Sequence, residues 1–212
     1  LLLADMDSTI VVGETLDELA GFAGVKQQVE EITTRAMHGE IDFQGALHER
    51  VALLKNLPEE ALAETASAMQ LMPGAKSLVG TMKQNGAISV LVTGGFMYFA
   101  DDVANNAGFD FVHGNRLEIK EGRLSGKVIP PILDKDAKLA YLQDYSQKHE
   151  IDKADILAIG DGANDLPMLE AAGLGIGYQP KPLVEKKLLN VILHSDLRAA
   201  LYAQGYQGEF ER

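Results

Sequence analysis

Two aspartates, Asp5 and Asp7, directly follow the apolar run Leu1-Leu2-Leu3-Ala4. An apolar run bounded by polar residues is typical of a buried parallel strand, and open α/β sheets bind ligands beyond the carboxyl ends of such strands. Two clustered carboxylates repel each other and lose solvation unless something positive lies between them. A magnesium ion with a phosphate ester would supply that charge. The alternative is a polar turn that happens to contain two acids. Motifs elsewhere in the chain are needed to distinguish these two interpretations.

A hydroxyl and two glycines follow a second apolar stretch, in the segment Val92-Thr93-Gly94-Gly95-Phe96. Glycines permit close approach of the backbone to a ligand, and unpaired N–H groups at the start of a helix attract an anion. The segment therefore predicts a phosphate-binding turn, with the Thr93 hydroxyl as a further donor. An ordinary strand-to-helix turn with Thr93 as the N-cap explains the same residues equally well.

A second acidic segment, Gly160-Asp161-Gly162-Ala163-Asn164-Asp165, follows an apolar stretch that ends at Ile159. Asp161 and Asp165 add two carboxylates at another strand end, and the glycines let the backbone turn sharply around a bound ion. This combination favours a metal site. The alternative is a polar loop in which Asn164 or Asp165 caps the next helix.

Lys138 is a further candidate, placed early in an expected helix among the apolar residues Ala137, Leu139 and Leu142. A cation there mildly opposes the helix dipole, which hints that another group needs its charge. Taken alone, Lys138 is better explained as a solvent-exposed lysine.

The elements that must position these residues alternate between helix and strand after Pro73-Gly74. Apolar spacing and turn residues predict them in this order: helix 75–84, strand 88–92, helix 96–107, strand 109–112, a hairpin of 116–120 with 124–128 around Glu121-Gly122, helix 136–149, strand 156–159, helix 166–172, strand 174–176 and strand 191–193. Such alternation predicts an α/β fold with a doubly wound, mostly parallel, Rossmann-like sheet.

Residues 13–72 depart from this alternation, because they read as nearly all helix. Apolar residues recur there at helical spacing, and Pro58 followed by Glu59-Glu60 is a favourable helix start. We therefore expect an all-helical cap of residues 13–72, inserted after the first strand and lying above the carboxyl ends of the strands. The catalytic core would then be discontinuous, with residues 1–12 and 73–212.

The composition excludes several classes of protein. The chain has 212 residues and a formal net charge of −12, which makes it a poor candidate for binding nucleic acid. Its 0 cysteines exclude disulfides, thiolate metal sites and a cysteine nucleophile. No apolar stretch approaches the roughly 18 residues that span a membrane, and no signal segment opens the chain. We expect a cytoplasmic protein, monomer or homodimer, whose upstream sequence has been removed because the first residue is Leu1.

In combination, the motifs Asp-x-Asp, Thr-Gly-Gly, Lys and Gly-Asp-Gly-x-Asn-Asp resemble the four motifs of haloacid-dehalogenase-like phosphatases, in the same order and over nearly the whole chain. The resemblance implies phosphoryl transfer through an aspartyl-phosphate intermediate, with Asp5 as the nucleophile and Asp7 as general acid and base. It implies Mg²⁺ held by the Asp5 carboxylate, the Asp7 backbone carbonyl and Asp161. The phosphoryl oxygens would be held by Thr93, Gly94, Gly95 and Lys138.

The loop after Asp161 receives supporting roles from the same resemblance. Asn164 is placed on the substrate side of the site, and Asn164 and Asp165 would orient the water shell of the metal or Lys138. As general acid, Asp7 needs a raised pKa, and we expect burial and the charge of Asp5 to raise it while magnesium lowers it.

Within this superfamily, the cap sequence resembles that of the phosphoserine phosphatases. That resemblance assigns four residues to the serine moiety of O-phosphoserine: Glu14, Met37, Phe43 and Arg50. The chemistry agrees, because Glu14 can pair with the ammonium of the substrate and Arg50 can fork onto its carboxylate. The apolar pair would exclude water and strengthen both contacts. There are alternatives for these residues. Met37 and Phe43 would also fit as ordinary residues of a helix core, and Arg50 would also fit in a surface ion pair with Glu49 or Glu18.

Two departures from the family pattern qualify this resemblance. Many phosphoserine phosphatases have Ser where this chain has Thr93, and we expect the added methyl group to tighten the pocket. Many bacterial relatives also carry a small regulatory domain before the phosphatase. A related small-metabolite phosphatase or phosphotransferase, acting on phosphohomoserine or phosphothreonine, is the alternative function.

Overall fold

The computed structural model describes residues 1–37, 40–208 and 210, with the side chains of all of these except Met37 and Lys135. Its centre is a seven-stranded sheet in the order β4-β3-β2-β1-β5-β6-β7, parallel throughout except for the β3–β4 pair. The strands are β1 (Leu2–Ala4), β2 (Ser89–Phe96), β3 (Phe111–Lys120), β4 (Arg123–Ile129), β5 (Leu157–Gly160), β6 (Leu174–Tyr178) and β7 (Val191–Ile192). The predicted α/β class with a mostly parallel sheet is confirmed.

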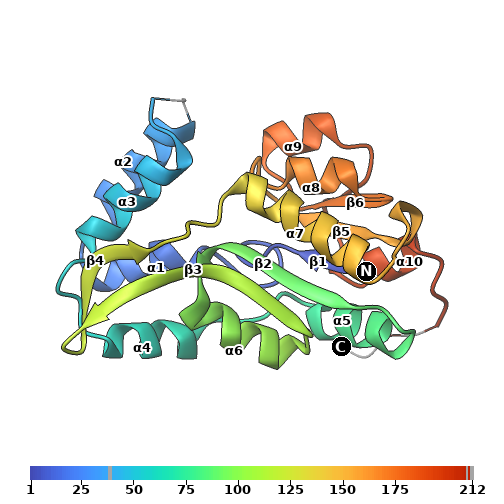
Figure 1. Cartoon of the computed structure of the whole chain (residues 1–212), viewed down its shortest axis with the longest axis horizontal. Coiled ribbons are helices and arrows are strands. Elements are labelled where there is room, and N and C mark those ends of the chain that lie inside the picture. The colour runs from blue at the N-terminus through green and yellow to red at the C-terminus, as the bar shows by residue number, and fades with distance from the viewer. Residues whose placement is uncertain (38–39, 209, 211–212) are drawn as a thin grey trace.

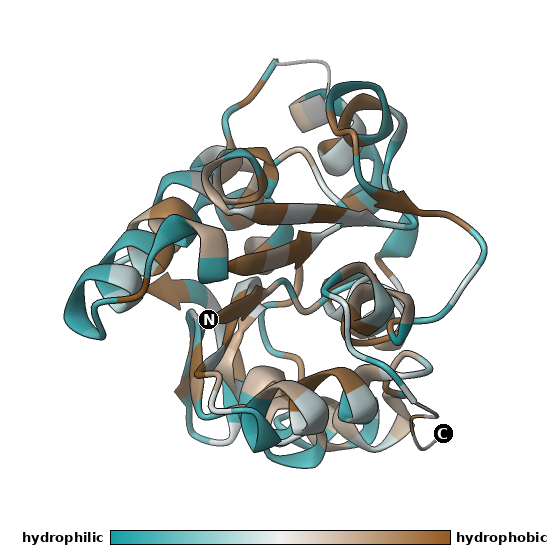
Figure 2. Ribbon diagram, turned by 90° about the vertical axis from the view of Figure 1, so that its right-hand side faces the viewer, coloured by the Kyte–Doolittle hydropathy of each residue, from teal (hydrophilic) through white to brown (hydrophobic). Residues whose placement is uncertain are grey.

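The central strands β1 and β5 are apolar without interruption because both of their faces are buried. In β1, Leu2 and Ala4 join one hydrophobic cluster, whereas Leu3 joins the cluster on the opposite face. Successive side chains of a strand point to opposite faces, so a strand covered on both sides must be apolar at every position. Figure 2 shows these strands as hydrophobic bands enclosed by helices whose outer turns are hydrophilic.

Helices cover the two faces of the sheet in separate groups (Figure 1). One face is covered by α5 (Ala75–Gln84), α6 (Met97–Ala107) and α10 (Ala199–Ala203). The other is covered by α7 (Lys135–Lys148), α8 (Leu166–Ala171) and α9 (Pro182–Lys187), and a 3-10 turn, η1 (Lys153–Asp155), precedes β5. Among the described residues, none of the helices combines the length and apolar character that crossing a membrane requires.

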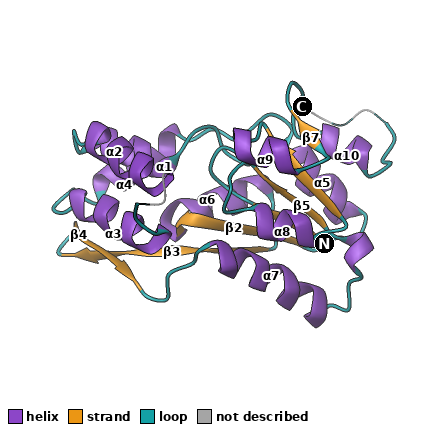
Figure 3. Ribbon diagram, turned by 90° about the horizontal axis from the view of Figure 1, so that it is seen from above, coloured by secondary structure: helices purple, strands orange, loops and turns teal. Residues whose placement is uncertain are grey.

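Four helices are inserted between β1 and α5, within the stretch predicted to be helical. They are α1 (Thr15–Phe22), α2 (Lys26–Met37), α3 (Phe43–Leu53) and α4 (Glu60–Ala68). Seen from above, they gather at one end of the molecule, which the β3–β4 hairpin also reaches (Figure 3). Backbone hydrogen bonds join the hairpin to the chain before α4, with Asn56 N donating to Leu124 O over 2.8 Å and Glu59 N to Gly122 O over 2.9 Å. The division into a cap of 13–72 and a core of 1–12 with 73–212 stays a prediction.

Several predicted boundaries were wrong. β2 runs through both glycines to Phe96, so α6 begins only at Met97 and Thr93 is not its N-cap. The predicted strands 109–112 and 116–120 are parts of one strand, β3, because Asn115 continues the ladder opposite Phe96. Neither α9 nor α10 was predicted, since such short helices carry too few turns to show a periodic pattern and depend on tertiary packing.

Candidate active site

The predicted site lies where the strand order of the sheet reverses. β1 is central, β2 and β5 flank it, and chain order runs outward from it on both sides, which is the position where open α/β sheets bind ligands. Asp5 follows β1, Thr93 lies in β2, and Asp161 follows β5. The backbone N–H of Asp5 donates to Ile159 O over 3.0 Å, so the two acidic segments are held in register.

A cavity of about 540 Å³ opens at this point and gathers most of the predicted residues. Those that line it are Asp5, Asp7, Glu14, Phe43, Arg50, Thr93, Gly94, Gly95, Asp161 and Asn164. Met37 ends α2, and its side chain lies outside the described part of the chain. A larger hollow of about 870 Å³ lies near Leu1, Ile88 and Ile156, at the other end of the strands, and within the described residues none of the motif residues lines it.

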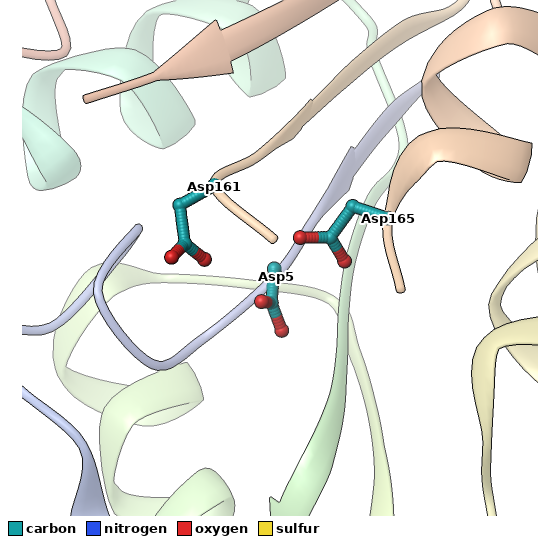
Figure 4. A group of neighbouring side chains, drawn as sticks. All are labelled: Asp5, Asp161 and Asp165. Carbon is teal, nitrogen blue, oxygen red and sulfur yellow. The ribbon is translucent and has the colours of Figure 1, made fainter. Parts of the chain in front are cut away.

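Three carboxyl groups form the floor of the site. Asp5, Asp161 and Asp165 are buried, offer oxygens that all lie within 4.8 Å of one another, and turn toward a common space (Figure 4). Lys138 joins them from α7: its Nζ lies 2.6 Å from Asp5 Oδ1 and 2.6 Å from Asp165 Oδ1, and its side chain is only 1% exposed. Lys138 is therefore a buried counter-ion, and the explanation as a solvent-exposed lysine was wrong.

The burial of these groups shifts their pKa values. Burial raises the pKa of Asp5, the charges of Asp165 and Asp161 raise it further, and Lys138 opposes them. Burial alone would lower the pKa of Lys138, but the charges of Asp165 and Asp5 outweigh it and raise that pKa, so the lysine is held in its charged form. Burial also raises the pKa of Asp161. The cluster is an anionic site that Lys138 neutralises only in part.

Asp165 does not cap α8, although it stands at the N-cap position. Its carboxylate accepts from Gly162 N over 2.9 Å and from Lys138 Nζ over 2.6 Å. A Cβ atom on Gly160 would lie 2.5 Å from Asp165 Oδ2, so this carboxylate fits only because Gly160 has no side chain. Asp165 therefore holds both the acidic loop and the lysine.

Asp7 occupies the rim above this floor. Its Oδ1 accepts from Thr15 N over 2.9 Å, and its Oδ2 accepts from Thr93 Oγ1 over 3.3 Å. Burial raises the pKa of Asp7 to about 6, and the largest neighbouring charge acting on it is that of Glu14. The predicted rise in the pKa of Asp7, and burial as its cause, are therefore correct. The charged neighbour was predicted wrongly, because Glu14 rather than Asp5 has the largest effect. Glu14 comes close because the chain folds back after Ser8 toward the start of α1.

The Thr93-Gly94-Gly95 turn faces Asp7. Gly95 N donates to Thr93 Oγ1 over 2.8 Å, so this amide is engaged by the threonine rather than open to the cavity. The Thr93 methyl group points toward β3, where a Cβ on Gly114 would lie 3.1 Å from Thr93 Cγ2. The methyl group is therefore accommodated against Gly114, and it does not narrow the pocket as expected.

Lys181 is a site residue that was not predicted from the sequence. From the start of α9, its Nζ lies 3.2 Å from Glu14 Oε1 and 3.1 Å from Asp161 Oδ2, and it lines the cavity. Burial opposes its charged form, but Glu14 and Asp161 raise its pKa. Only the apolar segment before it, Leu174–Tyr178, signalled another strand ending at the same edge of the sheet.

Phe43 and Arg50, both from α3, also line the cavity. Phe43 packs over the glycine turn, where a Cβ on Gly94 would lie 3.2 Å from its Cζ. Glu49 pairs with Arg35 Nη1 over 2.8 Å, so the alternative pairing of Arg50 with Glu49 is not what forms. Burial lowers the pKa of Arg50, while Asp17 and Glu14, which also line the cavity, are the charges that stabilise its cation.

The fold, the paired strand-end acids and the buried lysine define a class of hydrolases. Residues 2–170 match the haloacid dehalogenase-like hydrolase family, and the chain belongs to that family. Within it, the chain falls among the phosphoserine phosphatases, as its relatives show.

A phosphoserine phosphatase of Streptococcus thermophilus is 44% identical over 93% of this chain and 92% of its own length. One of Archaeoglobus fulgidus is 45% identical over 87% of this chain, which spans only 54% of that relative. Two solved structures are similar over 95% of the chain. One is a substrate-bound phosphoserine phosphatase complex, with 36% identity, a TM-score of 0.88 and 96% of that chain covered. The other is a phospho-aspartyl intermediate analogue of phosphoserine phosphatase, with 37% identity, a TM-score of 0.89 and 97% of that chain covered.

Proposed function

We propose that this chain is a magnesium-dependent phosphatase that hydrolyses O-phospho-L-serine to L-serine and phosphate, the last step of serine biosynthesis. The observation behind this proposal is that one cavity is lined by two chemically different sets of side chains. Asp5 and Thr93, with Lys138 behind them, suit a phosphoryl group, while Glu14 and Arg50 suit an ammonium and a carboxylate. Phosphoserine carries all three groups. The helices of 13–72 would form a cap that closes over the core and excludes water.

The floor of the site fits Mg²⁺. Three carboxylates within 4.8 Å of one another offer the hard oxygen ligands that this ion prefers, and Lys138 offsets only part of their charge. Asp5, Asp161 and the backbone carbonyl of Asp7 would hold the ion, which when bound neutralises charge on the phosphoryl group. Asp165, engaged by Lys138 and Gly162, would act by orienting the lysine.

Asp5 would act as nucleophile through Oδ2. Its Oδ1 already accepts from Met6 N over 2.8 Å and from Lys138 Nζ over 2.6 Å, which leaves Oδ2 to attack phosphorus. The bond between Oδ2 and phosphorus forms while the bond between phosphorus and the serine oxygen breaks, and Asp7 gives its proton to that oxygen. Thr93, Gly94, Gly95 and Lys138 would hold the phosphoryl oxygens, with the Gly95 amide exchanging its bond to Thr93 for one to the substrate.

In the second half of the reaction, a water attacks the phosphorus of the aspartyl phosphate and Asp7 takes its proton. The bond between Asp5 and phosphorus breaks, which releases phosphate and restores the carboxylate. Burial and Glu14 raise the pKa of Asp7 in the metal-free chain, and a raised pKa helps the group to give a proton in the first half and to take one in the second. Asn164, at the cavity wall, would contact the substrate.

The test is phosphate release from L-phosphoserine with and without Mg²⁺, using Asp5→Asn beside the wild type. We expect the variant to lose turnover and to form no acid-stable phosphoprotein, because an amide oxygen is a poor nucleophile. Asp101→Asn, on the exposed surface of α6, is the matched control and should retain activity. A phosphoprotein that still forms in Asp5→Asn would remove Asp5 from the role of nucleophile.

A second experiment tests the substrate. Arg50→Ala should weaken kcat/KM for L-phosphoserine far more than for an aryl phosphate, since only phosphoserine carries the carboxylate that Arg50 would bind. Arg35→Ala, which removes a surface partner of Glu49, is the control and should affect neither substrate. Equal losses on both substrates would remove Arg50 from the specificity site. Higher activity on phosphohomoserine or phosphothreonine would favour the alternative function.

A further inference from the structure

The phosphate-binding turn is tied to the rest of the site by a buried amide that the mechanism does not use. Asn115, in β3, is 1% exposed. Its Nδ2 donates to Gly94 O over 2.8 Å and to Leu133 O over 3.2 Å, and its Oδ1 accepts from Leu133 N over 2.7 Å. The donor and acceptor pattern of Leu133 permits only one orientation of the amide, so its NH₂ group must face Gly94.

The bond to Gly94 fixes the direction of the peptide between Gly94 and Gly95. A trans peptide is planar, so its C=O and N–H point in opposite directions. Asn115 holds the Gly94 carbonyl toward β3, so the N–H of Gly95 must point away from β3. On that side the N–H donates to Thr93 Oγ1. Two flanking glycines would otherwise leave this peptide free to rotate, because glycine has few conformational restrictions.

The bonds to Leu133 connect the same amide to Lys138. Leu133 immediately precedes Asp134, the N-cap of α7, whose side chain accepts from Asp136 N and Ala137 N. Lys138 lies in the first turn of this helix. Asn115 thus joins the glycine turn of β2 to the start of the lysine helix, two elements that are far apart in the sequence.

We propose that Asn115 is a positioning residue: it fixes the Gly94–Gly95 peptide, whose N–H holds the Thr93 hydroxyl oxygen, and it sets the start of α7, so that the turn and Lys138 converge on one phosphoryl group. The inference rests on the proposed function. Gly114 supports it, because its missing Cβ allows Thr93 and the Gly95 carbonyl to pack against β3, at 3.1 Å and 3.4 Å from where a Cβ would lie.

The test measures binding of inorganic phosphate and of L-serine, separately and with Mg²⁺ present, by calorimetry. Asn115→Asp keeps the shape but replaces the NH₂ group with an oxygen facing two carbonyls. We expect the phosphate affinity to fall by roughly tenfold or more, since small displacements of positioning groups are costly, while L-serine affinity stays within about twofold. Under the proposed function L-serine would bind to Glu14 and Arg50, so its affinity reports general loosening of the fold.

Ser89→Ala is the matched control. Ser89 is buried at the opposite end of β2, and its hydroxyl donates to Asp110 Oδ2 over 2.9 Å and accepts from Asp110 N over 3.0 Å. This variant also removes a part-buried hydrogen bond, between β2 and the residue that precedes β3, but away from the site. It should lower the melting temperature without changing phosphate affinity.

Asn115→Ala decides the matter if Asn115→Asp does not fold. It removes the bond to Gly94 O and both bonds to Leu133 without placing an oxygen against two carbonyls. We expect a selective, several-fold loss of phosphate affinity. Unchanged phosphate affinity, or equal losses for phosphate and L-serine, would overturn the inference. If the wild type itself binds neither ligand, the proposed function fails, and no variant is needed to see it.

Discussion

Asp7 illustrates, at the scale of a single residue, how a group suited to catalysis destabilises the fold that contains it. Its pKa is raised from 3.8 to about 6, first by burial and then by Glu14. The raised pKa means that the folded chain holds the proton more tightly than the unfolded chain, so the ionised carboxylate costs stability. This cost is absent below pH 3.8, grows between pH 3.8 and 6, and is constant above pH 6.

We therefore predict that Asp7→Asn stabilises the metal-free protein above pH 6 and has no such effect near pH 4. The gain is at most about 3 kcal/mol, because the pKa difference sets its upper limit. Urea unfolding in chelator at pH 4, 6 and 8 measures it, and the same variant should lose turnover of phosphoserine. A gain that is equal at all three pH values would show that Asp7 ionises normally.

At the scale of elements, the β3–β4 hairpin supports the helix that carries Arg50. Gly126, in β4, has a φ of +81°, and a Cβ there would lie 3.0 Å from Lys55 Cβ and 3.4 Å from Ala52 Cα, at the end of α3. The absence of a side chain is what allows β4 and α3 to approach so closely. The position of Phe43 and Arg50 over the cavity therefore depends on a strand at the edge of the sheet.

Gly126→Ala is predicted to push α3 away from β4 and to raise KM for phosphoserine by roughly tenfold, with a smaller effect on an aryl phosphate. The left-handed backbone adds a cost of about 1–2 kcal/mol. Gly122→Ala, at the hairpin tip, shares the positive φ (+70°) but meets nothing within 4 Å, so it should lower stability with KM unchanged. If the two variants change KM equally, backbone strain rather than contact with α3 is responsible.

At the scale of the whole molecule, acidic charge dominates, with a formal net charge of −12. The buried acids of the site concentrate part of this charge at the carboxyl ends of β1 and β5. Folding without a metal must overcome their mutual repulsion, and a cation that binds only the folded state stabilises it by mass action.

Mg²⁺ is accordingly predicted to raise the melting temperature, with a gain in unfolding free energy of about 2.7 kcal/mol at a hundredfold excess over its dissociation constant. Asp161→Asn should abolish that shift while raising the melting temperature of the metal-free protein, because burial already opposes the ionised Asp161. Thermal melts in MgCl₂ and in NaCl of equal ionic strength separate binding from screening. The same shift in both salts would contradict a specific site.

The motifs at strand ends could be predicted because each polar residue follows an apolar run in the sequence. Asp5, Asp7, Thr93 and Asp161 each follow an apolar run, and parallel strands bring such ends to one edge of the sheet. Lys138 carried one weak local signal, its place in the first turn of a helix, and only the resemblance gave it a role, because an exposed lysine explains the same position. Lys181 was marked only by the apolar strand before it and Asn115 not at all, since their roles arise from contacts with segments distant in the sequence.

Local patterns along the chain were enough to predict the class of fold and the inventory of reactive groups, because periodic apolar residues and glycine-rich turns act over a few neighbouring positions. Tertiary structure alone decided which groups meet: that Glu14 raises the pKa of Asp7, that Lys138 is buried between Asp5 and Asp165, and that the Thr93 methyl group packs on Gly114. The physical reason is distance, since charge interactions, desolvation and packing depend on separations in space that chain order does not specify.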